Sequence, residues 1–389
     1  MGIHKPINAC FNLTNDCNCK CKYCFVAQKP NYMTIDVAKD AVNYLARNLQ
    51  EQRKDHCNIT FFGGEPTLCW DSIIVPIVSY IDKTYPGKFT FSMTTNGTLL
   101  NSERIQFMAD HKIHPHLSMD GARETQECNR PMKSGASSFD AVEKNIPYIL
   151  RQFPSTTFRA TITPESGART FDDFIYCMKM GFSNCFFVPN NRKKWTTEDK
   201  NILYNQLEKI YNFYTLAFLN GAEIPISFAA LADGIKENVQ FSQSNFFERD
   251  ENHCGMGETS ISIAYNGDIF ACQEQPSLGR LSVFYIGDIY NGIDEKRHDK
   301  LLKQFIHNKN NQCENKQLCI NCPRTEICKN KCCPSTSYDL FQSFDIHAEM
   351  DCLWKLWNFY LSRELIEKMK EAKGDSFKNY FYRVVKGVI

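Results

Sequence analysis

The chain has 389 residues, of which 43% are hydrophobic and 23% charged, and its formal net charge is +1. This composition is typical of a globular protein of about two domains and excludes disordered and fibrous chains. The near-zero charge argues against a global field that would attract nucleic acid or an anionic membrane. No run reaches the ~18 apolar residues of a membrane span, and the first residues lack signal-peptide features, so we expect a cytoplasmic protein.

Short apolar runs alternate with amphipathic stretches through the first half of the chain. The runs predicted as strands are 7–14, 57–64, 88–97, 113–121, 156–164 and 185–190. The stretches predicted as helices are 34–49, 71–85 with an interruption at Pro76, 101–111, 138–150, 171–181 and 197–221. About six strand–helix pairs predict an α/β fold with parallel strands, either an open doubly wound sheet or an incomplete barrel.

The segments that follow the first four strands are unusual in sequence. A cysteine cluster follows the first, Gly-Gly-Glu-Pro at 63–66 the second, Thr-Thr-Asn-Gly-Thr at 94–98 the third, and Ser-Met-Asp-Gly at 118–121 the fourth. Parallel strands bring their carboxyl ends to one edge, so we expect these loops to meet there. From Cys254 onward the sequence changes to short strands, turns and cysteines. We predict one domain over 1–230, a second over 231–352 and a helical segment over 353–389.

The 19 cysteines are the strongest chemical signal. In a reducing compartment, clustered cysteines hold metal or carry out redox chemistry more often than they form disulfides. Cys17, Cys21 and Cys24 have a spacing that suits three irons of a [4Fe–4S] cube, which leaves the fourth iron open. The alternative is a zinc site with Cys19 as its fourth ligand.

These cysteines, together with Gly-Gly-Glu-Pro and Ser-Met-Asp-Gly, resemble the radical S-adenosylmethionine (SAM) superfamily, over roughly residues 6 to 220. The resemblance implies a partial (β/α)6 barrel, a cluster on Cys17, Cys21 and Cys24, and S-adenosylmethionine on the open iron. Cleavage of this cofactor would give a 5′-deoxyadenosyl radical that abstracts hydrogen from the substrate. The residues that the resemblance places at the cofactor are Tyr23, Gly63, Gly64, Glu65, Pro66, Asn96, Ser118 and Arg130. In this interpretation the glycines leave room for the methionine moiety, and Glu65 accepts from its ammonium group.

The later cysteines resemble the SPASM domain, which carries two auxiliary [4Fe–4S] clusters and brings the expected total to three. The resemblance assigns Cys319, Cys322, Cys328 and Cys352 to the distal cluster. It assigns Cys254, Cys272 and Cys332 to the nearer one. Sulfatase-maturing relatives have a further cysteine where this chain has Ser260. The fourth ligand is therefore Cys313, Cys333 or a substrate thiolate, or that iron stays open.

The SPASM resemblance implies a peptide substrate, with a thioether or other oxidative crosslink installed in a ribosomally made precursor. The alternative is oxidation of Cys or Ser to formylglycine in a sulfatase. Sulfatase-maturing enzymes have a basic aspartate where this chain has Gln273, so we rank that activity second, with Glu274 as the remaining possible base. A non-catalytic iron–sulfur or zinc protein is the alternative of another class.

The expected partners are a precursor peptide and an external electron donor of the flavodoxin or ferredoxin type, with no nucleic acid and no membrane. The segment before Cys17 has no room for a winged-helix leader-recognition domain. We therefore expect the leader to be read by the barrel, by the C-terminal helices or by a separate leader-binding protein.

Overall fold

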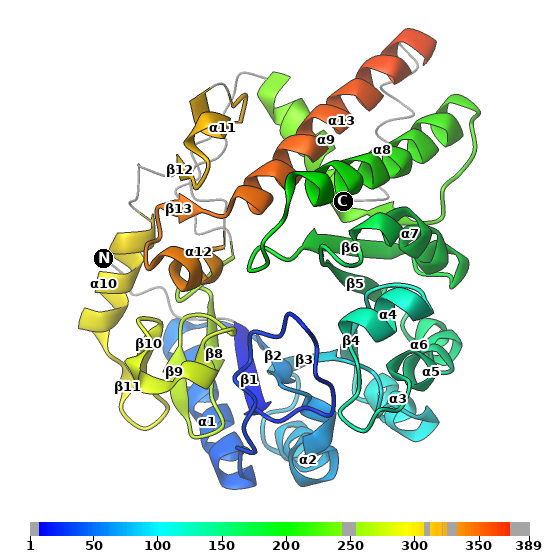
Figure 1. The fold of residues 1–389 in the computed structure, drawn as a ribbon. Coiled ribbons are helices and arrows are strands. Elements are labelled where there is room, and N and C mark those ends of the chain that lie inside the picture. The colour runs from blue at the N-terminus through cyan, green and yellow to red at the C-terminus, as the bar shows by residue number, and fades with distance from the viewer. Residues whose placement is uncertain (1–7, 243–253, 307–311, 321, 325–332, 374–389) are drawn as a thin grey trace. The chain divides into compact units, whose positions relative to one another are not determined.

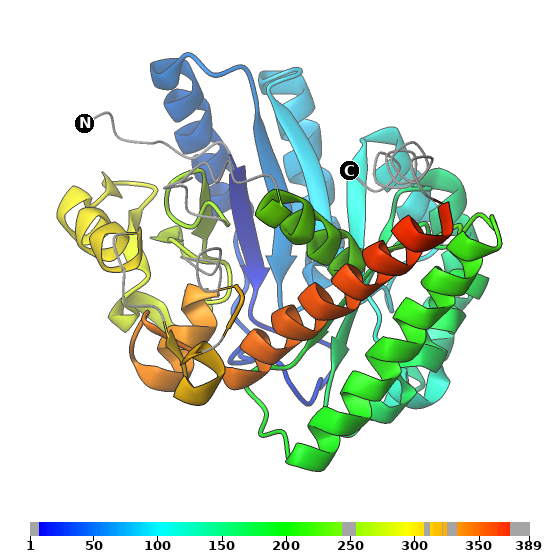
Figure 2. The same cartoon turned by 90° about the horizontal axis from the view of Figure 1, so that it is seen from above.

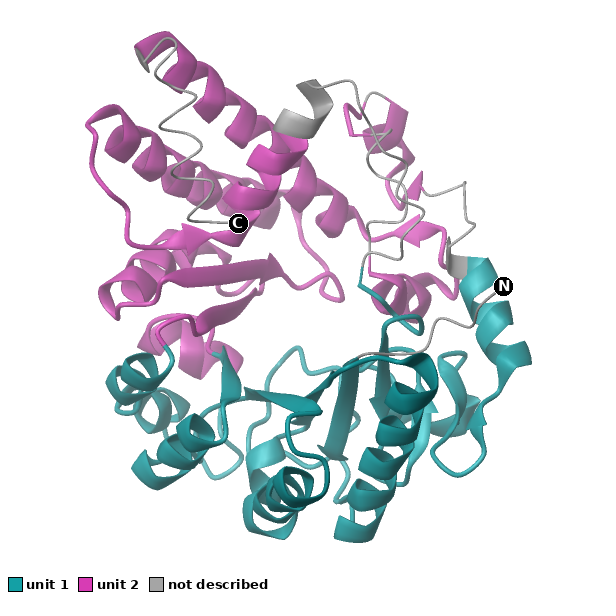
Figure 3. Ribbon diagram, turned by 180° about the vertical axis from the view of Figure 1, so that it is seen from behind, with its two compact units in different colours: residues 1–118, 131–153, 250–310 teal, residues 119–130, 154–249, 311–389 magenta. Residues whose placement is uncertain are grey.

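The computed structural model describes residues 8–242, 254–306, 312–320, 322–324 and 333–373. The chain divides into two compact units, each made of several segments (Figure 3). Unit 1 comprises 1–118, 131–153 and 250–310, and unit 2 comprises 119–130, 154–249 and 311–389.

Unit 1 is built on a sheet whose central strands are parallel (Figure 1). Within this unit the strand order is β11-β10-β9-β8-β1-β2-β3-β4. The first four strands and their helices are β1 (Asn8–Thr14), α1 (Ile35–Gln52), β2 (Cys57–Gly63), η1 (Pro66–Cys69), η2 (Trp70–Ile74), α2 (Val75–Thr84), β3 (Phe89–Thr95), α3 (Ser102–Asp110), β4 (Ile113–Ser118), α5 (Ser138–Glu143) and α6 (Ile146–Gln152). Strand β1 is buried along nearly its whole length, as expected for a strand covered on both faces.

A later segment of the chain extends this sheet beyond β1. It contains β8 (Ser260–Ile263), β9 (Asp268–Phe270), η4 (Pro276–Leu281), β10 (Tyr285–Asp288), β11 (Gly292–Ile293) and α10 (Glu295–Ile306). Strand β8 pairs in parallel with β1, with Ala9 opposite Ile261, and Asn12 Nδ2 donates to Ser262 Oγ at 2.5 Å. The strand that precedes the cysteine cluster therefore lies inside the sheet rather than at its edge.

Unit 2 contains a smaller parallel sheet and the C-terminal helices. Its elements are α4 (Arg123–Asn129), β5 (Thr157–Ile162), η3 (Gly167–Arg169), α7 (Thr170–Lys179), β6 (Asn184–Pro189), α8 (Thr197–Leu219), β7 (Ser227–Phe228), α9 (Ala229–Ser242), β12 (Gln312–Cys313), α11 (Lys316–Ile320), α12 (Pro334–Phe341), β13 (Ile346–His347) and α13 (Glu349–Lys373). Helix α13 packs against α9 and α8 (Figure 2). Tyr211 Oη donates to Asn358 Oδ1 at 2.8 Å in this packing, so a buried polar contact fixes α13 against α8.

The predicted class, an α/β fold with parallel strands and a helical C-terminal region, is confirmed. Two helices differ from prediction. The 71–85 segment is a π-helical turn followed by α2, and Pro76 lies in the first turn of α2, where a missing N–H has no cost. The 138–150 segment forms two helices, and Pro147 opens the second of them.

The predicted domain boundaries stay a prediction, because the two compact units are discontinuous in sequence and divide the chain differently. No helix within the described residues is both long and apolar enough to cross a membrane.

Candidate active site

The predicted cluster ligands lie on the cysteine loop, which we define as residues 15–33 and which follows β1. The two ends of this loop are joined by backbone hydrogen bonds. Asn15 N donates to Asn31 O at 3.1 Å, and Met33 N donates to Leu13 O at 2.7 Å. The cysteine loop is therefore closed by hydrogen bonds at its base, where it leaves the end of β1.

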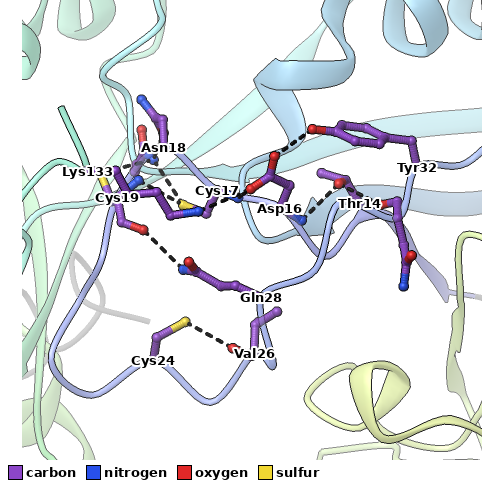
Figure 4. Close-up of polar contacts among 12 residues, drawn as sticks. Thr14, Asp16, Cys17, Asn18, Cys19, Cys24, Val26, Gln28, Tyr32 and Lys133 are labelled. Atoms are coloured by element: carbon purple, nitrogen blue, oxygen red, sulfur yellow. Dashed lines mark hydrogen bonds and ion pairs between the residues drawn. The ribbon is translucent and has the colours of Figure 1, made fainter.

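Asp16 anchors the start of the cysteine loop (Figure 4). Its carboxylate accepts from Tyr32 Oη at 2.6 Å and from Lys133 Nζ at 3.1 Å. The hydrogen bond from Tyr32 is the largest of the effects that lower the pKa of Asp16. Lys20 N also donates to Pro131 O at 2.8 Å, so residues 131–133 support the loop through both main chain and side chain.

Cys17 and Cys19 form a buried pair within the cysteine loop, at 7% and 1% exposure. Cys19 N donates to Cys17 Sγ at 3.3 Å. A side-chain hydrogen bond from Cys19 lowers the pKa of Cys17, and the same pairing, together with burial, raises the pKa of Cys19. The two thiols therefore differ, with a lowered pKa at Cys17 and a raised pKa at Cys19.

The two glycines after β2 lie against the backbone of the cysteine loop. A Cβ on Gly63 would lie 2.3 Å from Thr14 O, and one on Gly64 would lie 2.0 Å from Asp16 O. Gly63 also has a φ of 133°, which other residues rarely adopt. A side chain at either position would therefore collide with the main chain of Thr14 or Asp16. The predicted contact of these glycines with a cofactor stays a prediction.

Glu65 joins the loops that follow β2 and β3. Its side chain is fully buried. One carboxylate oxygen accepts from Thr67 N at 3.0 Å, from Thr67 Oγ1 at 2.5 Å and from Thr95 Oγ1 at 2.7 Å, and the other accepts from Asn96 N at 2.7 Å. Burial raises the pKa of Glu65, and these hydrogen bonds oppose that effect. Glu65 N also donates to Asp16 O at 2.9 Å, so this residue contacts the cysteine loop as well. The prediction that Glu65 binds a cofactor ammonium group stays a prediction.

Asn96 extends this network to the cysteines themselves. Its Nδ2 lies 3.7 Å from Cys17 Sγ, 3.5 Å from Cys19 Sγ and 2.8 Å from Asn18 Oδ1. Its Oδ1 accepts from Thr98 N at 3.0 Å, so both ends of the amide are held. The structure directs the Asn96 amide toward the Cys17 thiol, and the predicted contact of Asn96 with the cofactor stays a prediction.

The other two predicted ligands, Cys21 and Cys24, lie in a turn in which Cys24 N donates to Cys21 O at 3.2 Å. The Cys24 thiol is exposed and lies 4.0 Å from Val26 O (Figure 4). In the part of the chain that the structure describes, no three His, Cys, Asp or Glu side chains converge closely enough to hold a metal ion. Three thiols on one short loop nevertheless supply the donor chemistry that an iron–sulfur cluster needs.

The remaining predicted cofactor residues of unit 1 lie at the ends of its strands. Pro66 is the first residue of η1, which Glu65 caps, and is buried. Ser118 ends β4 and is half-buried, and Tyr23 is a half-buried residue of the cysteine loop. Their cofactor contacts stay predictions.

Arg130, in unit 2, is paired with an acidic residue of the Ser-Met-Asp-Gly motif. Its Nη2 lies 3.0 Å from Asp120 Oδ1, which also accepts from Thr161 N at 2.9 Å. Gly121 is required because a Cβ there would lie 2.1 Å from Asp173 Oδ1. This segment is thus held by two buried carboxylates, and the predicted contact of Arg130 with the cofactor stays a prediction.

The auxiliary-cluster cysteines fall partly outside the described residues. Cys328 and Cys332 lie outside them, and the described members are Cys254, Cys272, Cys319, Cys322 and Cys352. Of the two reserve ligands, Cys313 is buried and donates from its N–H to Cys319 Sγ at 3.1 Å, whereas Cys333 is exposed. Glu274, the predicted base, is half-buried and lies two residues after Cys272.

Sequence reasoning missed several residues that hold the cysteine loop, among them Tyr32, Thr95 and Lys133. Tyr32 and Lys133 lie in no motif, and Thr95 lies in the Thr-Thr-Asn-Gly-Thr segment without having been singled out. Lys133 is more than a hundred residues from Asp16 in sequence, so nothing short of the fold could pair them. Thr95 had a weak signal, since it directly precedes Asn96 at the end of a predicted strand.

The chain matches the Radical SAM superfamily over residues 11–175. It is 23% identical over 342 residues to a cysteine-type anaerobic sulfatase-maturating enzyme of Clostridium perfringens, which covers 82% of this chain and 86% of that enzyme. Residues 11–175 therefore form a radical SAM domain, and the chain is a radical SAM enzyme that is similar to anaerobic sulfatase-maturating enzymes.

Solved structures agree in fold. The native enzyme anSMEcpe with bound AdoMet has a TM-score of 0.71 at 18% identity, covering 99% of this chain and 100% of that one. Streptococcus suis SuiB bound to its precursor peptide SuiA has a TM-score of 0.61 at 18% identity, covering 90% of this chain and 76% of that one. The expected radical SAM fold is therefore confirmed.

Replacing Gly64 with Ala tests the close approach of the two loops. We expect Gly64→Ala to lower the free energy of unfolding by about 1–3 kcal/mol, because the added methyl group must displace the backbone at Asp16. Gly167→Ala is the matched control, since its Cβ would come no closer than 3.6 Å to its nearest neighbour, a ring carbon of Trp195. Urea unfolding would measure both, and equal stability of the two variants would contradict the assignment.

Replacing Glu65 with Gln tests the buried carboxylate. The amide of Glu65→Gln would put an N–H group against the Asn96 N–H, so we expect a loss of about 1–3 kcal/mol in the free energy of unfolding. Glu223→Gln, at an exposed position, is the control and should be neutral. A neutral result for Glu65→Gln in thermal or urea unfolding would show that the carboxylate does not hold the loops together.

Proposed function

We propose that this protein is a radical SAM/SPASM enzyme that installs an oxidative crosslink, such as a thioether, in a ribosomally made peptide. The observation that carries the proposal is the network around Cys17, in which the loops after β1, β2 and β3 are joined by Glu65 and Asn96. A buried network that ends on a thiol of the predicted cluster loop supports a cofactor site better than a purely structural turn.

In this proposal Cys17, Cys21 and Cys24 hold a [4Fe–4S] cluster, and S-adenosylmethionine binds beside it. When bound, the cluster and cofactor supply a 5′-deoxyadenosyl radical. The protein's own residues prepare the site. The Asn96 amide orients the Cys17 thiolate, and the buried Glu65 keeps the neighbouring loops in register. That solved neighbours bind AdoMet supports the choice of cofactor.

The later cysteines would hold two auxiliary clusters as the SPASM resemblance assigns them. Cys319, Cys322, Cys328 and Cys352 form one set, and Cys254, Cys272 and Cys332 the other. A radical left on a substrate carbon must lose an electron to end as a crosslink, and an auxiliary cluster could accept that electron. An external flavodoxin- or ferredoxin-type protein would exchange electrons with the enzyme, and a separate leader-binding protein remains a proposed partner. We propose a cytoplasmic location, because the free cysteines that would bind the clusters stay reduced in that compartment.

Formylglycine formation is the second candidate, and one observation favours it. Resemblance to a sulfatase-maturating enzyme extends over 82% of this chain. Against it, Gln273 stands where those enzymes are expected to have a basic aspartate, so Glu274 would have to serve instead. The likeness to SuiB, bound to a precursor peptide, supports a peptide substrate in either case.

Replacing Cys17, Cys21 and Cys24 together with Ala tests the cluster assignment. After anaerobic reconstitution we expect the parent to bind about twelve irons in three cubanes and the variant about a third fewer. The variant should lose cofactor cleavage under dithionite and keep the auxiliary absorbance. The control Cys57→Ala changes a buried cysteine of β2 and should behave as the parent. Continued cleavage by the triple variant, or a colourless parent with bound zinc, would refute the assignment.

Mass spectrometry of co-expressed peptides distinguishes the two activities. A cysteine-containing precursor encoded beside the gene should lose two hydrogen atoms, keep its sulfur and become resistant to thiol alkylation. A sulfatase-derived peptide carrying cysteine should stay unchanged. Exchange of sulfur for oxygen together with the loss of two hydrogen atoms in the second peptide, with the first unmodified, would establish the sulfatase-maturing activity instead.

A further inference from the structure

His347 is a buried histidine with one ring nitrogen still to be accounted for. It lies in β13 of unit 2 and is 3% exposed. Its Nδ1 lies 3.3 Å from Ser337 Oγ, at the end of the first turn of α12. Its Nε2 is buried and has no hydrogen-bond partner among the residues that the structure describes. Buried polar nitrogens are nearly always paired, so Nε2 calls for a partner other than these residues.

The strand pairing places His347 beside Cys313. Strand β13 pairs with β12, which sets His347 opposite Cys313. Glu314 N donates to His347 O at 2.8 Å in the same pairing. The N–H of Cys313 donates to Cys319 Sγ at 3.1 Å, so two cysteines adjoin the strand pair.

Two backbone hydrogen bonds place the segments that carry Cys352 and Cys333 near His347. Cys352 N donates to Ala348 O at 3.2 Å, so Cys352 is one helical turn from the residue after His347. Ser337, the partner of Nδ1, donates from its N–H to Cys333 O at 3.0 Å. His347 therefore lies where the segments carrying Cys313, Cys319, Cys333 and Cys352 come together.

We propose that His347 Nε2–H donates a hydrogen bond to a sulfur atom of the auxiliary cluster held by Cys319, Cys322 and Cys352. The Ser337 hydroxyl can donate to Nδ1, which leaves the ring proton on Nε2. The sulfur atoms of a cluster are acceptors, and hydrogen bonds to them tune its reduction potential. His347 is thus a positioning and tuning residue, and its role rests on the proposed SPASM function.

The sign of the effect follows from charge. Reduction adds an electron to the cluster, and a hydrogen bond to sulfur stabilises this more negative state. His347 therefore raises the potential of the cluster, and removing its N–H should lower that potential. A merely structural histidine would not shift the potential of a cluster that remains intact.

The experiment uses the full chain carrying Cys17, Cys21 and Cys24→Ala, so that only auxiliary clusters contribute. Paramagnetic resonance during a redox titration measures their potentials, with iron and sulfide counted in parallel. We expect His347→Leu to keep the iron content and shift one auxiliary potential downward. His347→Gln, which keeps a donor, should recover most of that shift, and the control His111→Leu, at a half-buried position in unit 1, should leave both potentials unchanged.

Each other outcome decides against this role. Unchanged potentials in His347→Leu would mean that Nε2 bonds to protein, and loss of iron with a three-iron signal would make His347 a ligand. If His347→Leu does not fold, Ser337→Ala replaces it, because freeing Nδ1 should also lower the potential, and no shift there overturns the proposal. If the parent binds no auxiliary cluster at all, the proposed function fails rather than this inference alone.

Discussion

The site depends on one buried carboxylate. Glu65 is sealed from solvent and accepts hydrogen bonds from the loops that follow β2 and β3, while its own N–H reaches the cysteine loop after β1. Desolvating a carboxylate is costly, and only a full set of donors compensates for it. Three chain segments that are far apart in sequence are therefore fixed to one group, and the position of Cys17 follows from that arrangement.

The two glycines before Glu65 also fix how closely the loops after β1 and β2 approach each other. Because any side chain at Gly63 or Gly64 would collide with the main chain of the cysteine loop, the loops can approach each other only with glycine there. Once they have approached, Asn96 is brought within reach of the Cys17 thiol. The precision of the site comes from contacts between loops, each of which ends a rigid strand.

Much of the fold could be predicted from the sequence, because hydrophobic periodicity and the residues that end strands and helices are local features. Strands β1 to β6 fall at the predicted places, and Cys17, Glu65 and Asn96 come together as a parallel sheet requires. What sequence could not give is the identity of partners. The spacing of Gly-Gly-Glu-Pro cannot reveal that its glycines face protein backbone, nor that Asp16 is held by Lys133. Pro76 was misread because a proline that starts a helix and one that interrupts it look alike until the preceding turn is seen.

The pairing of β8 with β1 joins two segments of the chain that are some two hundred and fifty residues apart. During synthesis on the ribosome, β1 therefore emerges long before β8, its neighbour on one side. Until then β1 is an unprotected sheet edge, which is open to pairing with other chains. Folding of the cysteine loop at the end of β1 is thus coupled to synthesis of the chain as far as β8, so termination before that strand would leave an aggregation-prone fragment.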